Sequence, residues 1–274
     1  MAGPDLVRVG VLDFGLCEVG ASQIQRLRQT TESAQAAESL GFYRYWLGEH
    51  NPTAAPWSYP IEVLRDILDA TSKIRVGAGG ILAGLHEPSK IAEDFLALAA
   101  AHPARLDLGI ARGRLTPSVS TARITHTVAT LSNAAHSRVI GPSLWILGNS
   151  RASAMLATSL SAGFAINGFL PAKPQANILQ FYEREWRSSD CMPSAILAIS
   201  GLVCETREEA LDLIADENPF ITINFVGGLD DCRRRIVTIA KRFYASELMF
   251  LDLSPTHKVK LRSLELLARV ALSV

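Results

Sequence analysis

Two ionisable side chains stand next to each other at the end of a run of strand-forming residues. Glu49 and His50 close the stretch GFYRYWLGEHN, which begins at Gly41 and is rich in aromatic residues that favour β-strands. Because side chains alternate along a strand, we expect His50 on the same face as Trp46 and Glu49 on the face of Tyr45. The pair suggests a reaction centre at the carboxyl end of a sheet or barrel, although a strand end that reaches water would also tolerate it.

Residues suited to an anion follow two other apolar runs. Arg112 comes directly after LDLGIA, and its planar group could donate several hydrogen bonds to a phosphate or carboxylate. Asn149, Ser150 and Ser153 lie where a strand gives way to a helix, and hydroxyl and free N–H groups at a helix start bind phosphate well. The alternatives are an ion pair for Arg112 and simple helix capping by either serine. Together they suggest two halves of a phosphate site.

The run GAGGILAG, from Gly77 to Gly84, contains several glycines but lacks the spacing of a dinucleotide fingerprint, and no helix opens immediately after it. Gly79 and Gly80 would let a flat ring approach the backbone or would permit an unusual peptide geometry at the strand end. A tight turn without a ligand is the alternative.

The sequence predicts no metal site and no serine-hydrolase site. It contains no HExxH, GxSxG or P-loop pattern, and its four cysteines are widely spaced, which suits reduced thiols in a cytoplasmic protein. The histidines other than His50 have no partners at ligand spacing, and we expect them to face solvent. These are His86, His102, His126, His136 and His257.

A regular alternation of predicted strands and helices must position these residues. We predict eight strands, at Leu6–Phe14, Gly41–Asn51, Ile74–Leu82, Leu106–Ala111, Leu144–Leu147, Phe164–Asn167, Ala195–Cys204 and Glu247–Leu253. Eight such units over 274 residues predict a (β/α)₈ TIM barrel in the α/β class rather than an open sheet. Polar or glycine residues after the strands, from Asp13 to Asp252, would then meet at one rim.

Composition argues against a nucleic-acid-binding protein and against a membrane protein. Hydrophobic residues make up 48% and charged residues 20%, and 27 basic side chains balance 27 acidic ones, so no charge pattern indicates a nucleic acid or a membrane surface. Apolar runs are shorter than the roughly 20 residues of a membrane span. The start, MAGPDLVRVGVLDF, does not read as a signal peptide, and no linker interrupts the chain. We therefore expect one domain, 1–274.

On these residues the sequence resembles the bacterial luciferase-like flavin monooxygenase family. The resemblance rests on GFYRYWLGEHN, TSKIRVGAGGIL, PSKIAEDFLALAAAHPARLDLGIARG, LWILGNSRASA, and ELMF followed by LRSLELLA. It implies a barrel that binds reduced FMN, or a deazaflavin in one branch, at the carboxyl-end rim. His50 would then serve acid–base chemistry, and Gly79 and Gly80 would form a bulged third strand, often with a cis peptide, against which the ring rests. The phosphate would be held by Arg112, Ser150 and Ser153, with Asn149 beside it.

The resemblance further implies a two-component monooxygenase. A separate NAD(P)H:flavin reductase would supply FMNH₂, and the enzyme would use it with O₂ to oxygenate an organic, biosynthetic substrate. It also implies a homodimer. Asn51 replaces a second histidine common in the family, and Ala111 replaces the cysteine of light-emitting members. Compared with typical relatives, the segment between Arg114 and Ser143 is short, and the stretch between Asp216 and Phe225 lacks the extended insertion that covers the flavin in them. A non-catalytic flavin-binding or partner subunit, or a deazaflavin-dependent oxidoreductase, is therefore the alternative.

Overall fold

The computed structural model describes most of the chain, namely residues 7–15, 20–49, 57, 59–135, 141–171, 174–188, 192–214 and 221–271. The strands in this part are β1 (Arg8–Asp13), β2 (Arg44–Leu47), β3 (Arg75–Leu82), β4 (Leu106–Ala111), β5 (Ser143–Leu147), β6 (Gly163–Asn167), β7 (Ala195–Val203), β8 (Phe225–Gly227) and β9 (Glu247–Asp252). The helices are α1 (Gln23–Ser39), α2 (Ile61–Ala70), α3 (Pro88–Ala101), α4 (Pro117–Ala135), α5 (Arg151–Ser159), α6 (Ile178–Glu185), α7 (Arg207–Leu213), α8 (Leu229–Phe243) and α9 (His257–Ala271).

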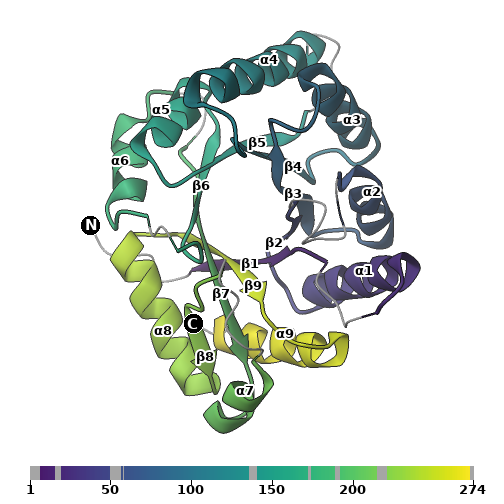
Figure 1. Cartoon of the computed structure of the whole chain (residues 1–274), viewed down its shortest axis with the longest axis vertical. Coiled ribbons are helices and arrows are strands. Elements are labelled where there is room, and N and C mark those ends of the chain that lie inside the picture. Colours follow the sequence, from purple (N-terminus) through teal and green to yellow (C-terminus); the bar gives the residue numbers. More distant parts are fainter. Residues whose placement is uncertain are drawn as a thin grey trace.

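Eight of the strands close into a parallel barrel surrounded by helices (Figure 1). Their order is β6-β5-β4-β3-β2-β1-β9-β7, and β7 pairs back with β6 to complete the ring. The predicted (β/α)₈ barrel is confirmed. The short strand β8 was not predicted, and it lies outside the ring, where among the described strands it pairs with Gly201–Val203 at the end of β7 alone. Three residues are too few to show the alternation by which strands are recognised.

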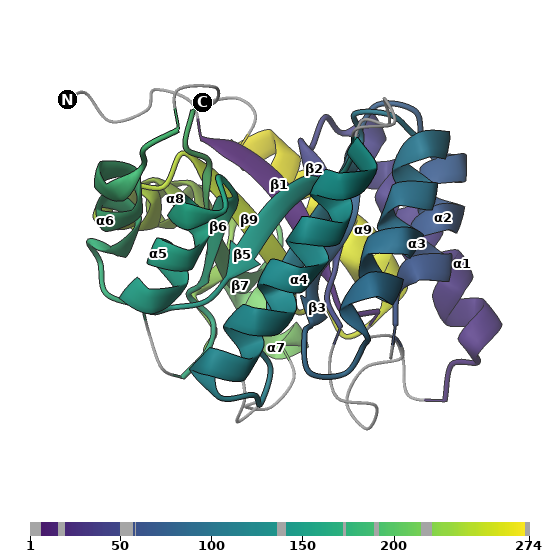
Figure 2. The ribbon, with the colours of Figure 1, turned by 90° about the horizontal axis from the view of Figure 1, so that it is seen from above.

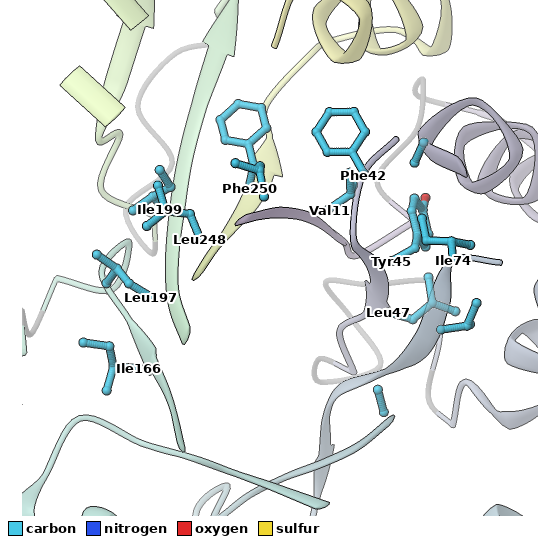
Figure 3. Close-up of a cluster of buried hydrophobic side chains, with 14 of the residues drawn as sticks. Val11, Phe42, Tyr45, Leu47, Ile74, Ile166, Leu197, Ile199, Leu248 and Phe250 are labelled. Atoms are coloured by element: carbon cyan, nitrogen blue, oxygen red, sulfur yellow. The ribbon is translucent and has the colours of Figure 1, made fainter. Parts of the chain in front are cut away.

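Both faces of the strands are buried, which is why the strand sequences are almost continuously apolar. Outward-facing side chains, among them Val11, Tyr45 and Phe250, form the layer between the barrel and the helices (Figure 3). Inward-facing side chains form a separate cluster inside the ring, which includes Trp46 and Trp145. The indole rings of these two tryptophans meet edge to face, with centroids 5.4 Å apart.

Buried charges close the amino-terminal end of the barrel. Arg44 donates to Asp107 over 2.6 Å and to Glu247 over 3.0 Å, and Arg75 donates to the second oxygen of Asp107 over 2.5 Å. Trp46 joins this cluster, because its Nε1 donates to Asp107 over 2.9 Å. Each carboxylate thus has charged donors that offset the cost of its burial, and the cluster fixes the indole above it.

None of the helices in the described ranges is both long and apolar enough to cross a lipid bilayer.

Candidate functional site at the carboxyl end of the barrel

The carboxyl end of the barrel opens into an apolar mouth. Deep in the ring, Leu12 and Trp46 are buried, whereas the inward-facing residues above them, Phe14, Gly79 and Leu147, are half-exposed. A strand position that faces inward and yet reaches solvent must border an opening. Apolar groups above the buried indole of Trp46 therefore border the mouth, and such surroundings suit a flat aromatic ligand.

One wall is the bulge in β3. The register with β4 shifts between Gly79 and Ile81, and the Gly79–Gly80 peptide bond is cis, so both features expected of this strand are confirmed. A Cβ atom at Gly79 would lie 2.5 Å from the ring of Trp46, and one at Gly80 would lie 2.6 Å from the carbonyl oxygen of Gly109. The close approach of these neighbours requires glycine at both positions. The half-exposed surface of Gly79 is therefore bare backbone.

Arg112 lies at the rim, directly after β4, and β3 separates β4 from β2. The β4–β5 register pairs Ala111 with Leu147, so the residues that follow them, Arg112 and Gly148, are neighbours on adjacent strands about 4.8 Å apart. Arg112 is exposed, and within the described residues its side chain forms no hydrogen bond or ion pair. The alternative of an ion pair with a rim carboxylate is thus absent from this part of the structure.

The start of α5 meets the rim beside Arg112. Ser150 caps the helix, because its hydroxyl accepts a hydrogen bond from the N–H of Ser153 over 3.2 Å, and the two hydroxyls are 3.0 Å apart. The Ser153 hydroxyl lies 2.4 Å from the point that a Cβ of Gly148 would occupy. Glycine at 148 thus allows Ser153 to sit over the end of β5, where a helix N-terminus and an arginine converge.

Asn149 fastens the end of β5 to the end of β6. Its side-chain amide donates to the carbonyl oxygen of Asn167 over 2.8 Å, and its oxygen accepts from the N–H of Asn167 over 2.7 Å. Asn167 in turn accepts from the N–H of Phe169 over 3.0 Å. These bonds give Asn149 a structural role, while its contact with a cofactor stays a prediction.

His50 lies outside the described residues, and its neighbour Glu49 shows how the chain leaves β2. The Glu49 carboxylate is fully buried. It accepts the N–H of Leu82 over 2.7 Å and lies 2.6 Å from Nε2 of His86. Glu49 thus points away from the interior, as alternation predicts.

The expectation that the remaining histidines face solvent is wrong for three of them. His86 pairs with Glu49; Nε2 of His102 lies 3.1 Å from Asp69, and Nε2 of His257 lies 2.9 Å from Glu32. The exposed fractions of these imidazoles are only 18%, 16% and 14%. Their acidic partners are remote in sequence, so spacing could not reveal them. His126 is exposed as predicted, and His136 lies outside the described residues.

Two acidic residues predicted at the rim turn away from the mouth. Asp13 binds Nζ of Lys260 over 2.6 Å, the N–H of Gly15 over 2.8 Å and the hydroxyl of Tyr45. Burial alone would raise the pKa of Asp13, but the ammonium group and the hydrogen bonds outweigh burial and hold that pKa below its usual value. Burial raises the pKa of Asp252, and the hydrogen bonds from Ser254 and Ser263 offset only part of that rise.

Comparison with known proteins agrees with this geometry. Residues 7–126 match the family model described as luciferase-like monooxygenase. This part of the chain is similar to that family. The luciferase-like monooxygenase of Escherichia coli (strain K12) is 26% identical over 230 residues, covering 74% of this chain and 69% of the relative. The N-acetyl-S-alkylcysteine monooxygenase of Bacillus subtilis (strain 168) is 34% identical over 108 residues, covering 39% and 32% of the two chains.

The alignment with one relative indicates that this chain is short. The uncharacterised protein YvbT of Bacillus subtilis (strain 168) is 26% identical, with 96% of each chain covered. The alignment spans 322 residues, more than the 274 of this chain, so YvbT carries internal segments that have no counterpart here.

Solved structures share the barrel. Apo-MsnO8 superposes with a TM-score of 0.83 at 25% identity, with 98% of both chains covered. The oxygenating constituent of 3,6-diketocamphane monooxygenase from Pseudomonas putida, in complex with FMN, gives 0.74 at 14% identity, covering 98% of this chain and 99% of that one. An F420-dependent secondary alcohol dehydrogenase gives 0.70 at 13%, with the same coverage. The last two likenesses bear on the fold alone.

Proposed function

We propose that the protein is the oxygenase component of a two-component monooxygenase that binds reduced FMN in the mouth of its barrel. The observation that carries the proposal is the exposed Arg112, which has no partner among the described residues and lies next to the Ser150–Ser153 helix start, at the same end of the barrel as the bare backbone of Gly79. When bound, reduced flavin supplies the electrons that activate O₂ for insertion into an organic substrate. Bare backbone suits its ring, and the arginine and helix start suit its phosphate.

Different residues would exclude water, bind the phosphate, support the ring and transfer the proton. Phe14, Leu147 and the Trp46 floor would keep water from the ring, since an oxygenating site needs a dry cavity. Arg112, Ser150 and Ser153 would bind the phosphate, and Gly79 and Gly80 would support the ring. His50, for which strand alternation predicts the inward face, would give or take a proton at a ring nitrogen while the substrate is oxygenated. Asn149 would act beside the phosphate by holding β5 against β6.

The proposal includes partners. Two-component enzymes receive their reduced flavin from another protein, and the solved structure from Pseudomonas putida is described as an oxygenating constituent, a wording that implies a second component there. We therefore propose a separate NAD(P)H:flavin reductase, an organic substrate from a biosynthetic pathway, and a cytoplasmic homodimer whose subunits are single barrel domains spanning 1–274.

Titration with two flavins tests the phosphate site directly. Arg112→Ala should weaken FMN binding about tenfold or more, because a charge-assisted hydrogen bond to phosphate is worth roughly 1.5–3 kcal/mol. Riboflavin, which lacks the phosphate, should bind the variant and the parent equally. Quenching of flavin fluorescence gives both dissociation constants.

Arg65→Ala is the matched control, since Arg65 is an exposed arginine on α2. It should leave both affinities unchanged. Equal affinity of the parent protein for FMN and riboflavin would contradict the proposed phosphate site. Tighter binding of a deazaflavin than of FMN would instead favour a hydride-transfer enzyme, and flavin binding without oxygen consumption would favour a non-catalytic subunit.

A further inference from the structure

A small polar cavity lies between helices α1 and α9, outside the ring of strands. The two helices pack against each other (Figure 1, Figure 2). The cavity has a volume of about 10 Å³, and every described residue that lines it has a polar side chain. Gln29 and Thr30 line it from α1, and Ser254, Thr256 and Lys260 line it from the segment that joins β9 to α9 and from α9 itself. Contacts between helices are normally apolar, so this lining calls for a polar occupant.

One polar atom of the lining, Oε1 of Gln29, is buried without a hydrogen-bond partner among the described residues. Gln29 is only 7% exposed, so bulk solvent does not hydrate its amide oxygen. A buried amide oxygen without a partner costs free energy, and in folded proteins such groups bond to the protein or to an internal water. The position of Gln29 therefore indicates that the cavity holds a hydrogen-bond donor.

The basic side chains of the lining already have acidic partners. Nζ of Lys260 lies 2.6 Å from the carboxylate of Asp13. Nε2 of His257 lies 2.9 Å from the carboxylate of Glu32 on α1. Because a carboxylate stands beside each basic group, and because an ion that leaves water needs an opposite charge, the lining favours an uncharged ligand.

The size of the cavity decides which uncharged ligand fits. A volume of about 10 Å³ accommodates one water molecule and is too small for an organic molecule. The hydroxyl of Thr256 accepts the N–H of Val259 over 3.3 Å, and it also carries a proton that it can donate. The ammonium group of Lys260 has three protons. A water in the cavity can therefore accept from these groups while it donates to Gln29.

We infer that this cavity is a binding site for one internal water molecule, which donates to Oε1 of Gln29 and joins α1 to the start of α9. Lys260 lines the cavity and also bonds to Asp13 at the end of β1. The water thus extends the contact between β1 and α9 across to α1. The inference does not depend on flavin binding or on any reaction at the mouth of the barrel.

A high-resolution crystal structure of the parent protein tests the site directly. One water should appear in the cavity, within hydrogen-bond distance of Oε1 of Gln29 and of a second polar group of the lining. Electron density for an occupant larger than water would overturn the inference. So would a Gln29 amide that bonds to the protein alone, with no water beside it.

Magnetic relaxation dispersion of the water signal counts long-lived internal waters in solution. Gln29→Met keeps the length of the side chain but removes the amide oxygen, so the number of long-lived waters should fall by one relative to the parent. Gln23→Met is the matched control, because Gln23 is exposed at the start of α1, and it should leave that number unchanged.

An unchanged number of long-lived waters in Gln29→Met would show that the amide oxygen does not hold a water, and it would overturn the inference. The crystal structure of the parent decides the question even if this variant does not fold.

Discussion

The backbone of Gly79 is bare because the neighbouring indole leaves no space for a side chain. Trp46 cannot easily withdraw, since its Nε1 is bonded to Asp107, which is itself held by Arg44 and Arg75. The same pattern recurs at Gly48, where a Cβ would lie 2.2 Å from the ring of Phe14. The rings of Trp46 and Phe14 thus occupy the space that side chains at Gly79 and Gly48 would need, and these rings shape the inner wall of the mouth.

Gly79→Ala should therefore destabilise the fold. The added methyl group must displace the fixed Trp46 ring, and overpacking of this kind costs about 1–3 kcal/mol. Urea denaturation measures the loss. Gly141→Ala is the control, because a Cβ there would meet no atom within 4 Å, and its effect should stay within about 0.5 kcal/mol. Equal stability of the two variants would show that the indole is free to move.

His50→Ala should separate chemistry from binding. A positioned acid or base contributes about 10²–10⁴-fold to rate, so turnover with supplied FMNH₂ should fall by that order while FMN affinity stays within about threefold. His126→Ala, at an exposed position on α4, should behave like the parent. Normal product formation by His50→Ala, measured alongside oxygen consumption, would show that the imidazole has no such role.

At the scale of elements, the carboxyl end of β1 is joined to α9 by a buried ion pair. Asp13 and Lys260 are both buried, and Tyr45 of β2 donates a third bond to the same carboxylate. Although burial raises the pKa of Asp13, Lys260 and the hydrogen bonds lower it further than burial raises it. A carboxylate whose pKa is lower in the folded than in the unfolded chain stabilises the fold only while it is ionised.

This stabilisation should be present above about pH 4, the usual pKa of an unfolded aspartate, and should disappear as the pH falls through the folded pKa. Asp13→Asn leaves Lys260 without its charge partner and should cost about 3–5 kcal/mol at pH 7. The difference in the free energy of unfolding between this variant and the parent should be smaller at pH 3 than at pH 7. Asp66→Asn, at an exposed position on α2, is the control in the same urea titrations. An equal difference in unfolding free energy at pH 7 and pH 3 would show that the ionised Asp13 carboxylate is not the source of the stabilisation.

At the scale of the whole molecule, the barrel could be predicted because each strand–helix unit carries its own pattern. The eight barrel strands are apolar runs long enough to recognise, whereas β8, with three residues, is not. The places of Arg112 and Ser150 at the rim followed from their positions after strands, since parallel strands end at one rim.

What could not be predicted are contacts between residues far apart in the chain. The partners of His86, His102 and His257, and the outward orientation of Asp13, depend on which helix packs over which strand. Asn149 was predicted beside a cofactor from its position alone, whereas the bonds that occupy its side chain come from the neighbouring strand. Residue type and spacing thus predicted where a residue lies in the fold better than they predicted the bonds of its side chain.

A crystal structure of the protein with FMN bound tests the central claim most directly. The account predicts the isoalloxazine against Gly79 and Gly80 above Trp46, with the phosphate between Arg112 and the start of α5 and the imidazole of His50 facing the ring. An empty mouth in crystals saturated with FMN, or a phosphate bound away from Arg112 and Ser153, would contradict it.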